Sequence, residues 1–475
     1  LLTLGGALAG LLLARWAVMG VAGLDLARYQ VLKGLTLNGP VLAATALAAI
    51  LSGLLVGMAP GLRAMRVDVS KALRDSSRGS SGGASRHRLL RITVVTQYAL
   101  TLLLLVGAGL TMRSLDRLLR VDMGFAADDV VAFSVALPRS RYTDEKQRLA
   151  FWQALNTRLV AIPGVQSVGF AAGAPFTGSA GSTSYTLPSI PVQDGEPQRH
   201  ANQAFVFGDY FKTMGISIVR GRGFTLDDAT AGAPVMIVDE TLVKQSFGKT
   251  DPLGVAINHG PDGTIIGVAR SVKLHDLTEE AHPLVYHNYG RSAGWISTLT
   301  AVIRSPLPKD QVLTAARVGL RELDPSIALA NGVSIRERID DSLGPRRLST
   351  WILGTFAGLS LTLALLGVYA VMSHVVSDRT REIGIRAALG AQRSSIMGLV
   401  MRDGLSMAAM GLAIGAIAFA AVGRLLRALV YGVPVFDLLT ITGAAVVLVG
   451  AAVGACYLPS RRAVRVDPAL TLKAD

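Results

Sequence analysis

The chain has 475 residues, of which 51% are apolar, and its formal net charge is +14. Residues 116–341 hold 22 Lys and Arg against 24 Asp and Glu, a net charge of −2, which leaves 25 against 9, or +16, for the rest. A nucleic-acid-binding protein carries its basic residues on a folded domain, so this distribution argues against nucleic acid as a partner. The single cysteine, Cys456, excludes a disulfide or a cysteine-based metal site within these residues.

Long apolar runs predict membrane-spanning helices. About 18 or more apolar residues in a helix cross a hydrocarbon core roughly 30 Å thick. Six such runs occur, at residues 2–22, 38–60, 92–113, 350–374, 395–423 and 438–459. The sequence therefore predicts a multi-span α-helical protein of the lipid bilayer rather than two soluble domains.

Basic residues fill alternate connections between these runs. Arginines and lysines gather in 63–91, in 377–393 and after residue 460. Such residues are retained on the cytoplasmic side of a membrane. We therefore expect these three segments to be cytoplasmic, and the long segment 116–345 to be extracytoplasmic.

A short repeat links the two ends of the sequence. PGLRAMRVD at 60–68 and PSRRAVRVD at 459–467 each follow an apolar run, and transport proteins are often built from repeated membrane units. We interpret residues 1–62 as the last two spans of a first unit, and expect the protein to begin further upstream. Segment 63–91 is then a cytoplasmic basic linker, whose Gly- and Ser-rich residues 76–88 form a flexible tether or contact anionic lipids.

The second unit is complete in this interpretation. It comprises a span at 92–115, an extracytoplasmic α+β domain at 116–345 and a three-span domain at 346–475. Within the α+β domain, Thr143 is predicted as the N-cap of an amphipathic helix. Predicted strands lie at 129–137, 165–171, 202–207, 215–220, 234–238, 263–269, 297–303 and 326–330, and predicted helices at 143–162, 239–246 and 308–322.

No nucleotide site or catalytic constellation is predicted. The tripeptide Gly-Lys-Thr at 248–250 resembles part of a phosphate-binding loop. That loop requires a glycine five positions before Gly248, where Val243 stands. We therefore expect this chain to be no enzyme and to bind no cofactor.

Two groups of titratable residues have ordinary explanations. Asp227 and Asp228 are interpreted as solvated turn residues. His275, His282 and His287 share one loop-rich stretch, but no carboxylate completes a set of metal ligands. We expect surface or hydrogen-bonded histidines and no metal.

The segment SDRTREIGIRAALGAQRS, residues 377–394, is longer and more charged than a connector between two spans needs. Glu382 precedes Arg386 by four residues, which supports a helix by about 0.2–0.5 kcal/mol. Small side chains share one face, and Gly390 suits a helix C-cap. From the residues alone, a helix that docks on a partner and an amphipathic helix in the lipid headgroups are both open.

Three stretches point to one family. DRTREIGIRAALGAQRSSI, residues 378–396, closely resembles the cytoplasmic segment of MacB/FtsX-type ABC transporter permeases. CYLPSRRAVRVDPALTLKAD, at 456–475, resembles the end of their four-span unit. YFKTMGISIVRGRGF at 210–224, followed by VMIVDETLVKQSFG at 235–248, resembles their outer domain. With its tether, the chain is most similar to the duplicated orphan permeases (ADOP) of acidobacteria, here N-terminally incomplete.

This resemblance implies a function. The chain would be a multi-pass permease subunit of the bacterial inner (plasma) membrane, with a MacB-like periplasmic core domain. A separate ABC ATPase subunit would dock on coupling helix 377–393, and its ATP-driven motion would be transmitted to the extracytoplasmic domain to export an unidentified substrate. The implied docking residues are Arg379, Arg381, Glu382, Ile383, Gly384, Arg386, Ala387 and Gly390.

Two alternatives remain. An FtsX-like regulator would use the same motion to act on a periplasmic partner protein. A membrane sensor would bind a ligand outside and need no ATPase. A partner bound to residues 116–345 would favour the regulator, and insensitivity to changes at Glu382 or Gly384 would favour the sensor.

Overall fold

The structure, a computed structural model, describes residues 10, 39–40, 43–47, 50–51, 82–178, 181–190, 197–389, 392–426 and 430–464. The chain folds as two compact units. The helical unit comprises Leu1–Leu119 and Gly344–Asp475, and the α+β unit comprises Arg120–Leu343. The predicted spans at 2–22 and 38–60 lie largely outside the described residues.

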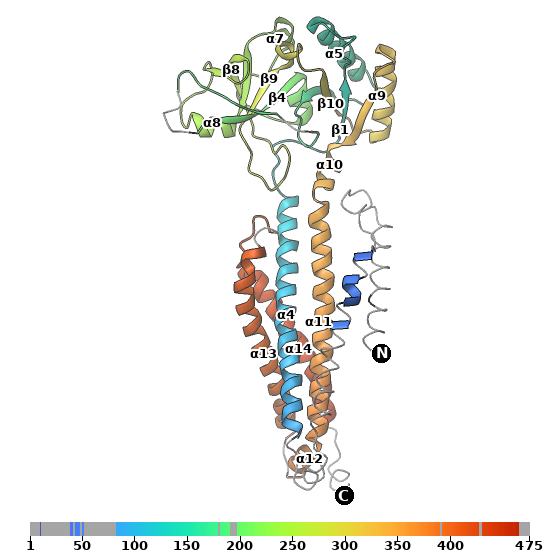
Figure 1. Cartoon of the computed structure of the whole chain (residues 1–475), viewed down its shortest axis with the longest axis vertical. Coiled ribbons are helices and arrows are strands. Elements are labelled where there is room, and N and C mark those ends of the chain that lie inside the picture. The colour runs from blue at the N-terminus through green and yellow to red at the C-terminus, as the bar shows by residue number, and fades with distance from the viewer. Residues whose placement is uncertain are drawn as a thin grey trace. The chain divides into compact units, whose positions relative to one another are not determined.

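Long helices dominate the helical unit (Figure 1). Four of them, in the described part, are long and apolar enough to cross a membrane, over Leu90–Leu119, Gly344–Asp378, Ser394–Arg424 and Leu438–Arg462. Among the described residues, this unit contains the helices α4 (Gly82–Leu119), α11 (Gly344–Asp378), α12 (Thr380–Ala388), α13 (Arg393–Leu426) and α14 (Leu438–Val464).

These helices pack through apolar stripes and small residues. α4 lies against both α11 and α13, and buries Tyr98, Leu102 and Leu110 in a shared core. A Cβ placed on Gly411 of α13 would lie 2.4 Å from the Tyr98 Cβ, and one on Gly415 would lie 3.0 Å from the Ala99 carbonyl oxygen. Glycine therefore permits the close approach of α13 to α4, as it does at membrane helix interfaces generally.

Helix α4 begins earlier than predicted. Residues 82–88 belong to the predicted tether, yet the structure is helical from Gly82 onward. Extending an existing helix adds one backbone hydrogen bond for each residue fixed, whereas starting one is costly. The apolar span therefore nucleates a helix that continues into the Gly- and Ser-rich segment.

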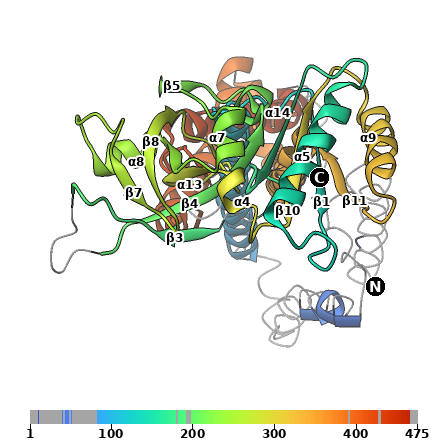
Figure 2. The same cartoon turned by 90° about the horizontal axis from the view of Figure 1, so that it is seen from above.

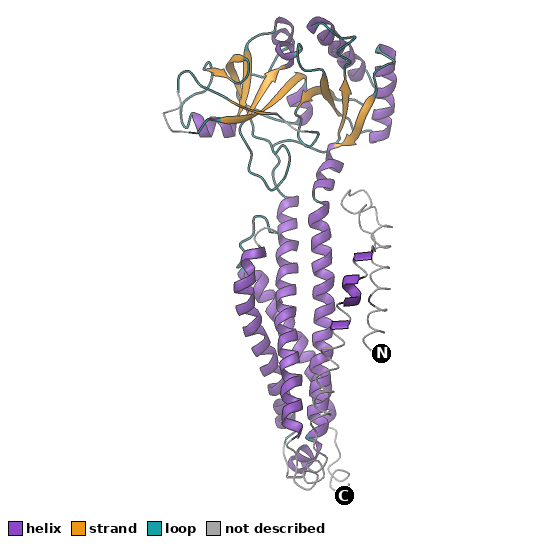
Figure 3. Ribbon diagram, viewed as in Figure 1, coloured by secondary structure: helices purple, strands orange, loops and turns teal. Residues whose placement is uncertain are grey.

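A mixed sheet forms the centre of the α+β unit, with helices packed on it (Figure 3). Its strand order is β11-β1-β10-β2-β4-β9-β6-β8-β5, with β3 beside β4 and β7 beside β8. Strand pairs β4–β9 and β6–β8 are parallel, and the other pairs among the described strands are antiparallel. The strands are β1 (Val130–Ala136), β2 (Ser167–Ala172), β3 (Ser182–Ser184), β4 (His200–Gly208), β5 (Ile218–Gly221), β6 (Val235–Asp239), β7 (Ala256–Asn258), β8 (Asp262–Ala269), β9 (Leu284–Asn288), β10 (Thr298–Arg304) and β11 (Leu329–Ser334).

The sheet carries two hydrophobic cores. One surrounds Trp152 of α5 and Val312 of α9, two helices that lie on the same part of the sheet in Figure 2. The other surrounds Val238 of β6 and Leu242 of α8. The helices of this unit are α5 (Glu145–Val160), α6 (Tyr210–Met214), α7 (Leu226–Ala231), α8 (Glu240–Ser246), η3 (Tyr289–Ser292), α9 (Lys309–Leu323) and α10 (Ile335–Ser342).

The structure confirms the predicted fold class and corrects details within it. Thr143 is not the N-cap of α5, because the helix begins at Glu145 with Asp144 as the capping residue. Asp228 is not a solvated turn residue. It occupies the third position of α7 and forms a capping box with Thr225, so its carboxylate accepts from the Thr225 backbone N–H at 2.8 Å.

Candidate functional site

Helix α12 connects α11 to the start of α13 and lies at one end of the helical unit (Figure 1). Its first turn continues almost directly from α11, since the Arg379 N–H donates to the Val375 carbonyl and the Ile383 N–H to the Arg379 carbonyl. Thr380 Oγ1 donates to the Val376 carbonyl at 2.9 Å. The helix therefore leaves α11 in a geometry that backbone hydrogen bonds define.

One apolar side chain anchors α12 to the helical unit. Ile383 is 3% exposed and belongs to the core formed by the long helices. Ile383 is one of the predicted docking residues; the structure packs its side chain inward, and its contact with a partner stays a prediction. Its burial holds α12 against the spans.

The outward surface of α12 combines charge with apolar area. Glu382 and Arg386 are about half exposed and form an ion pair at 2.6 Å. Ile385 is 44% exposed and Leu389, just after the helix, is 83% exposed. Sequence reasoning missed Ile385 and Leu389, although their spacing of four residues places them on one helical face.

The remaining predicted docking residues are placed as follows. Arg381, Gly384 and Ala387 lie within α12, and no side-chain environment is described for them. Gly390 lies outside the described residues, so its predicted C-cap is untested. Arg379 precedes the helix and pairs with a residue of the helical unit.

That partner is Asp403 of α13, which sequence reasoning did not connect to the segment. Its carboxylate lies 3.7 Å from the Arg379 guanidinium and 3.5 Å from that of Arg91, on α4. Exposed pairs of this kind contribute about 0–1 kcal/mol each. Asp403 thus ties the beginning of α4 and the α11–α12 junction to α13.

The α+β unit holds a buried histidine pair, His259 and His287, that only the structure reveals. Their Nδ1 and Nε2 atoms lie 2.9 Å apart, and His259 Nε2 lies 3.1 Å from the Ala201 carbonyl oxygen. Because a carbonyl only accepts, His259 Nε2–H must be the donor there. In a neutral ring Nδ1 is then the acceptor, so His287 donates its Nε2–H to His259.

Burial keeps both rings neutral. Burial lowers the pKa of His259, and burial with the nearby His259 and Arg291 lowers the pKa of His287 to about 3. The pair is therefore a neutral cross-link between the β7–β8 connection and β9 at physiological pH. Within the described ranges, no group of three or more His, Cys, Asp or Glu side chains is placed to hold a metal ion.

The Gly-Lys-Thr segment lies in a turn that follows α8, whose C-cap is Phe247. A phosphate-binding loop precedes a helix, because the helix N-terminus supplies the N–H donors. The position of this segment is thus the reverse of what phosphate binding requires.

Two family models match this chain in succession. Residues 99–316 match the MacB-like periplasmic core domain, and residues 354–468 match the FtsX-like permease C-terminal domain. The first match covers most of the α+β unit, and the second covers α12 with most of α11, α13 and α14.

Curated relatives agree with these matches. "Uncharacterized ABC transporter permease YknZ" of Bacillus subtilis is 27% identical over 61% of this chain and 74% of its own length. "Macrolide export ATP-binding/permease protein MacB" of Neisseria gonorrhoeae is 25% identical over 64% of this chain and 47% of its own length. The match thus spans about half the length of the MacB relatives. The crystal structure of the periplasmic region of MacB from Actinobacillus actinomycetemcomitans is 18% identical, with a TM-score of 0.30, over 45% of this chain and 94% of its own.

Proposed function

Because the chain belongs to the MacB/FtsX-like permeases of ABC-type systems, we propose that it transmits the motion of a separate ATPase subunit through α12 to its extracytoplasmic α+β unit. The protein is a membrane protein with an extracytoplasmic domain of the MacB type. We place it in the bacterial inner membrane. The motion would drive export of a substrate that the residues do not identify.

The observation that carries this proposal is the two-sided character of α12. Its inner side is fixed by Ile383, and its outer side presents the Glu382–Arg386 pair beside exposed Ile385 and Leu389. An exposed apolar side chain within a charged rim is the usual composition of a protein contact. A plain connector would need neither the anchor nor the exposed surface.

Helix α12 is also suited to pass on a displacement. The Arg379 N–H bond to Val375 joins it to α11, and the Arg379–Asp403 pair joins the same junction to α13. A push on α12 would therefore act on two spans together. No chemistry is required of the chain, since its sequence contains no complete phosphate-binding loop.

The test is co-purification of the ATPase activity. The complete tagged protein is isolated from its native membrane in mild detergent, as wild type and as Glu382→Lys, and ATP hydrolysis is measured in the eluate. We expect activity with the wild type and its loss with the variant. Glu322→Lys is the matched control, because Glu322 also forms an exposed ion pair, with Arg158, on the α+β unit.

Three results would count against the proposal. ATP hydrolysis that is equal in all three preparations would show that α12 is not the contact. No ATPase with any preparation would move the ATPase-independent sensor to the front. A periplasmic protein that co-purifies through the α+β unit, with no effect on export, would instead favour the regulator.

A further inference from the structure

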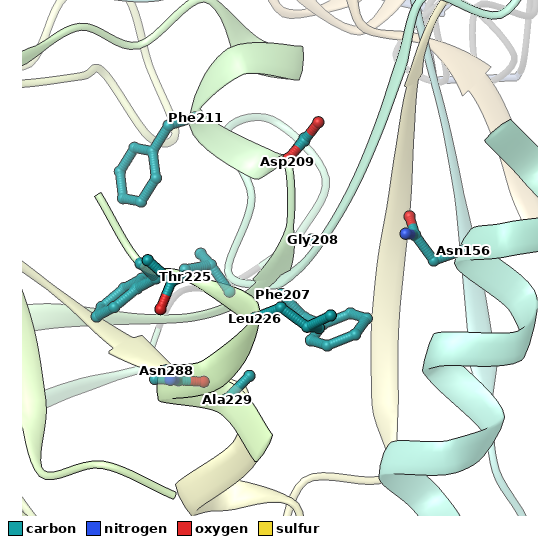
Figure 4. A pocket seen from close by; sticks show the side chains of 11 residues that line it. Asn156, Phe207, Gly208, Asp209, Phe211, Thr225, Leu226, Ala229 and Asn288 are labelled. Atoms are coloured by element: carbon teal, nitrogen blue, oxygen red, sulfur yellow. The ribbon is translucent and has the colours of Figure 1, made fainter. Parts of the chain in front are cut away.

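The α+β unit contains a cavity with a volume of about 210 Å³. The end of β4, helix α5, the segment from Phe224 into α7, and the end of β9 enclose it (Figure 4). Phe207, Phe211 and Phe224 give it an aromatic lining. None of these residues belongs to α12 or to the helical unit.

Two side-chain amides at this cavity have unused hydrogen-bonding atoms. Asn288 is 3% exposed, and its Oδ1 accepts from the Gly290 N–H at 3.0 Å, but its Nδ2 has no partner among the described residues. The buried Oδ1 of Asn156, on α5, has none either. More than nine in ten buried polar groups in proteins are hydrogen-bonded, and here two unpaired amide atoms line the same cavity.

The two amides lie on opposite sides of the view in Figure 4, with Phe207 and Leu226 between them. A molecule that fills the cavity would therefore meet an acceptor, Asn156 Oδ1, on one side and a donor, Asn288 Nδ2, on the other. An amide group offers both a donor and an acceptor, which match this pair.

A negative charge completes the lining. Asp209 follows β4 directly, is exposed, and its carboxylate has no ion pair or hydrogen bond among the described residues. Carboxylates without a partner at the mouth of a cavity attract cations. The aromatic walls add apolar contact and favourable stacking with a ring or a cation.

We propose that this cavity binds a small cationic amide: a molecule with an amide group for Asn156 and Asn288, an apolar group for the phenylalanine walls, and an ammonium group for Asp209. Pockets for drug-sized molecules measure about 300–1,000 Å³, so the occupant is smaller than these. A free α-amino amide has this chemistry, and so does the N-terminal residue of a peptide.

Substitution of Asn156 distinguishes a ligand contact from a structural role. An amide oxygen that is buried without a partner does not stabilise the fold, and its replacement by an apolar group of similar shape is nearly neutral or stabilising. A ligand that uses this oxygen would lose a hydrogen bond. Binding and stability are thus expected to change in opposite directions in Asn156→Leu.

The experiment uses the full chain in lipid nanodiscs and saturation-transfer NMR with L-phenylalaninamide. At pH 6.5 its amine is protonated, since α-amino groups titrate at about 7.7–8.0. A molecule this small is expected to bind with a Kd on the order of 1 mM. L-phenylalanine and N-acetyl-L-phenylalaninamide, which lack the amide and the cation respectively, should bind more weakly.

Variants assign the contacts. Asn156→Leu should weaken binding about three- to tenfold, the range for one lost hydrogen bond, and leave the unfolding temperature unchanged or higher. Gln153→Leu, one turn earlier on α5 and outside the cavity lining, should bind as the wild type does. Asp209→Asn should weaken the cationic probe but not the acetylated one.

Two results would contradict a ligand site in this cavity. Failure of every probe to bind the wild type, or unchanged binding together with a lowered unfolding temperature in Asn156→Leu, would overturn the proposal. Binding of the tripeptide Phe-Ala-Ala distinguishes the two candidate ligands, a free α-amino amide and the N-terminal residue of a peptide. Binding as tight as that of the amide identifies a peptide end, and weaker binding identifies a free amide. Failure here leaves ATPase docking on α12 unaffected, because the two tests share no residue.

Discussion

The two units of the chain distribute apolar and polar groups in opposite ways. In the helical unit, large apolar side chains such as Trp351, Phe356 and Leu363 are more than half exposed, although the helices also share a core. In the α+β unit the large side chains Trp152 and Phe170 are fully buried in a core. Exposed apolar residues on long helices are what a lipid environment selects, and a buried aromatic core is what water selects.

Polar interiors follow the same division. The α+β unit buries polar groups such as Asp239 and the His259–His287 pair, and these groups are hydrogen-bonded within the unit. In the helical unit, the described ion pairs that involve spans include those of Asp403, in the third turn of α13, and of Asp437, just before α14. An exposed apolar side chain is therefore expected to contact lipid in the helical unit and water in the α+β unit.

The largest effect is expected at Trp152. Its ring is fully buried, and its Nε1–H donates to Tyr289 Oη at 2.9 Å. Trp152→Ala should destabilise the α+β unit by about 3–5 kcal/mol through the cavity it leaves, measured as the free energy of opening from hydrogen exchange of strands β2 and β10. Trp295→Ala is the control, because Trp295 is 49% exposed, and its cost should be about 1 kcal/mol or less. Equal costs would contradict a well-packed core.

The direct test of the comparison pairs two exposed residues. Leu363 of α11 is 57% exposed and Val318 of α9 is 54% exposed. Leu363→Asp should cost about 3 kcal/mol, because a carboxylate would enter the hydrocarbon region, whereas Val318→Asp should change stability by about 0.5 kcal/mol. The fraction of membrane-inserted, folded protein measures both. Similar values for the two variants would show that Leu363 does not face lipid.

The sequence predicted the elements whose residue pattern is local. Strands at 234–238, 263–269 and 297–303 are observed within one residue at either end, since alternation and β-branched residues mark them clearly. The strand predicted at 326–330 is shifted to Leu329–Ser334, and β9 was missed. β9 is buried along its whole length, and such a strand shows no alternation from which to recognise it.

The contacts between distant residues were not predictable from one sequence. His259 and His287 meet only because β9 lies beside the β7–β8 connection, and Asn156 reaches the cavity at β4 only through packing of α5. The sequence places Ile383 on α12 without showing that its side chain packs against the spans. Periodicity defines the faces of a helix without saying which face meets the core.

A smaller effect is expected from pH at Asp228. The Arg222 guanidinium donates to both carboxylate oxygens, and this lowers the pKa of Asp228 to about 2, below the value of about 3.9 in an unfolded chain. The folded state therefore binds fewer protons, and the stabilisation is present above about pH 5 and is lost as the pH falls toward 2. Asp228→Asn should remove about 1–2 kcal/mol at pH 7 and flatten this pH dependence, measured by hydrogen exchange of α7. A wild-type slope in the variant would contradict the assignment.

The smallest effect on stability is expected for α12, where the same substitutions should change recovery of the ATPase strongly. The Glu382–Arg386 pair is half exposed and supports the helix by about 0.2–0.5 kcal/mol. A double variant, Glu382→Arg with Arg386→Glu, keeps opposite charges at the same spacing, so exchange of the Leu389 N–H, which bonds to the Ile385 carbonyl, should stay within about twofold of the wild type. The reversed order of the charges accounts for that small change.

ATPase recovery should nevertheless fall at least about tenfold, equivalent to 1.4 kcal/mol, because each charge now faces a partner group of its own sign. Such a loss exceeds what weakening of the helix alone supplies, so it separates docking from helix stability. If the double variant retains the ATPase while the single Glu382→Lys loses it, the pair matters through the helix, and the contact with the partner rests on Ile385 and Leu389 instead.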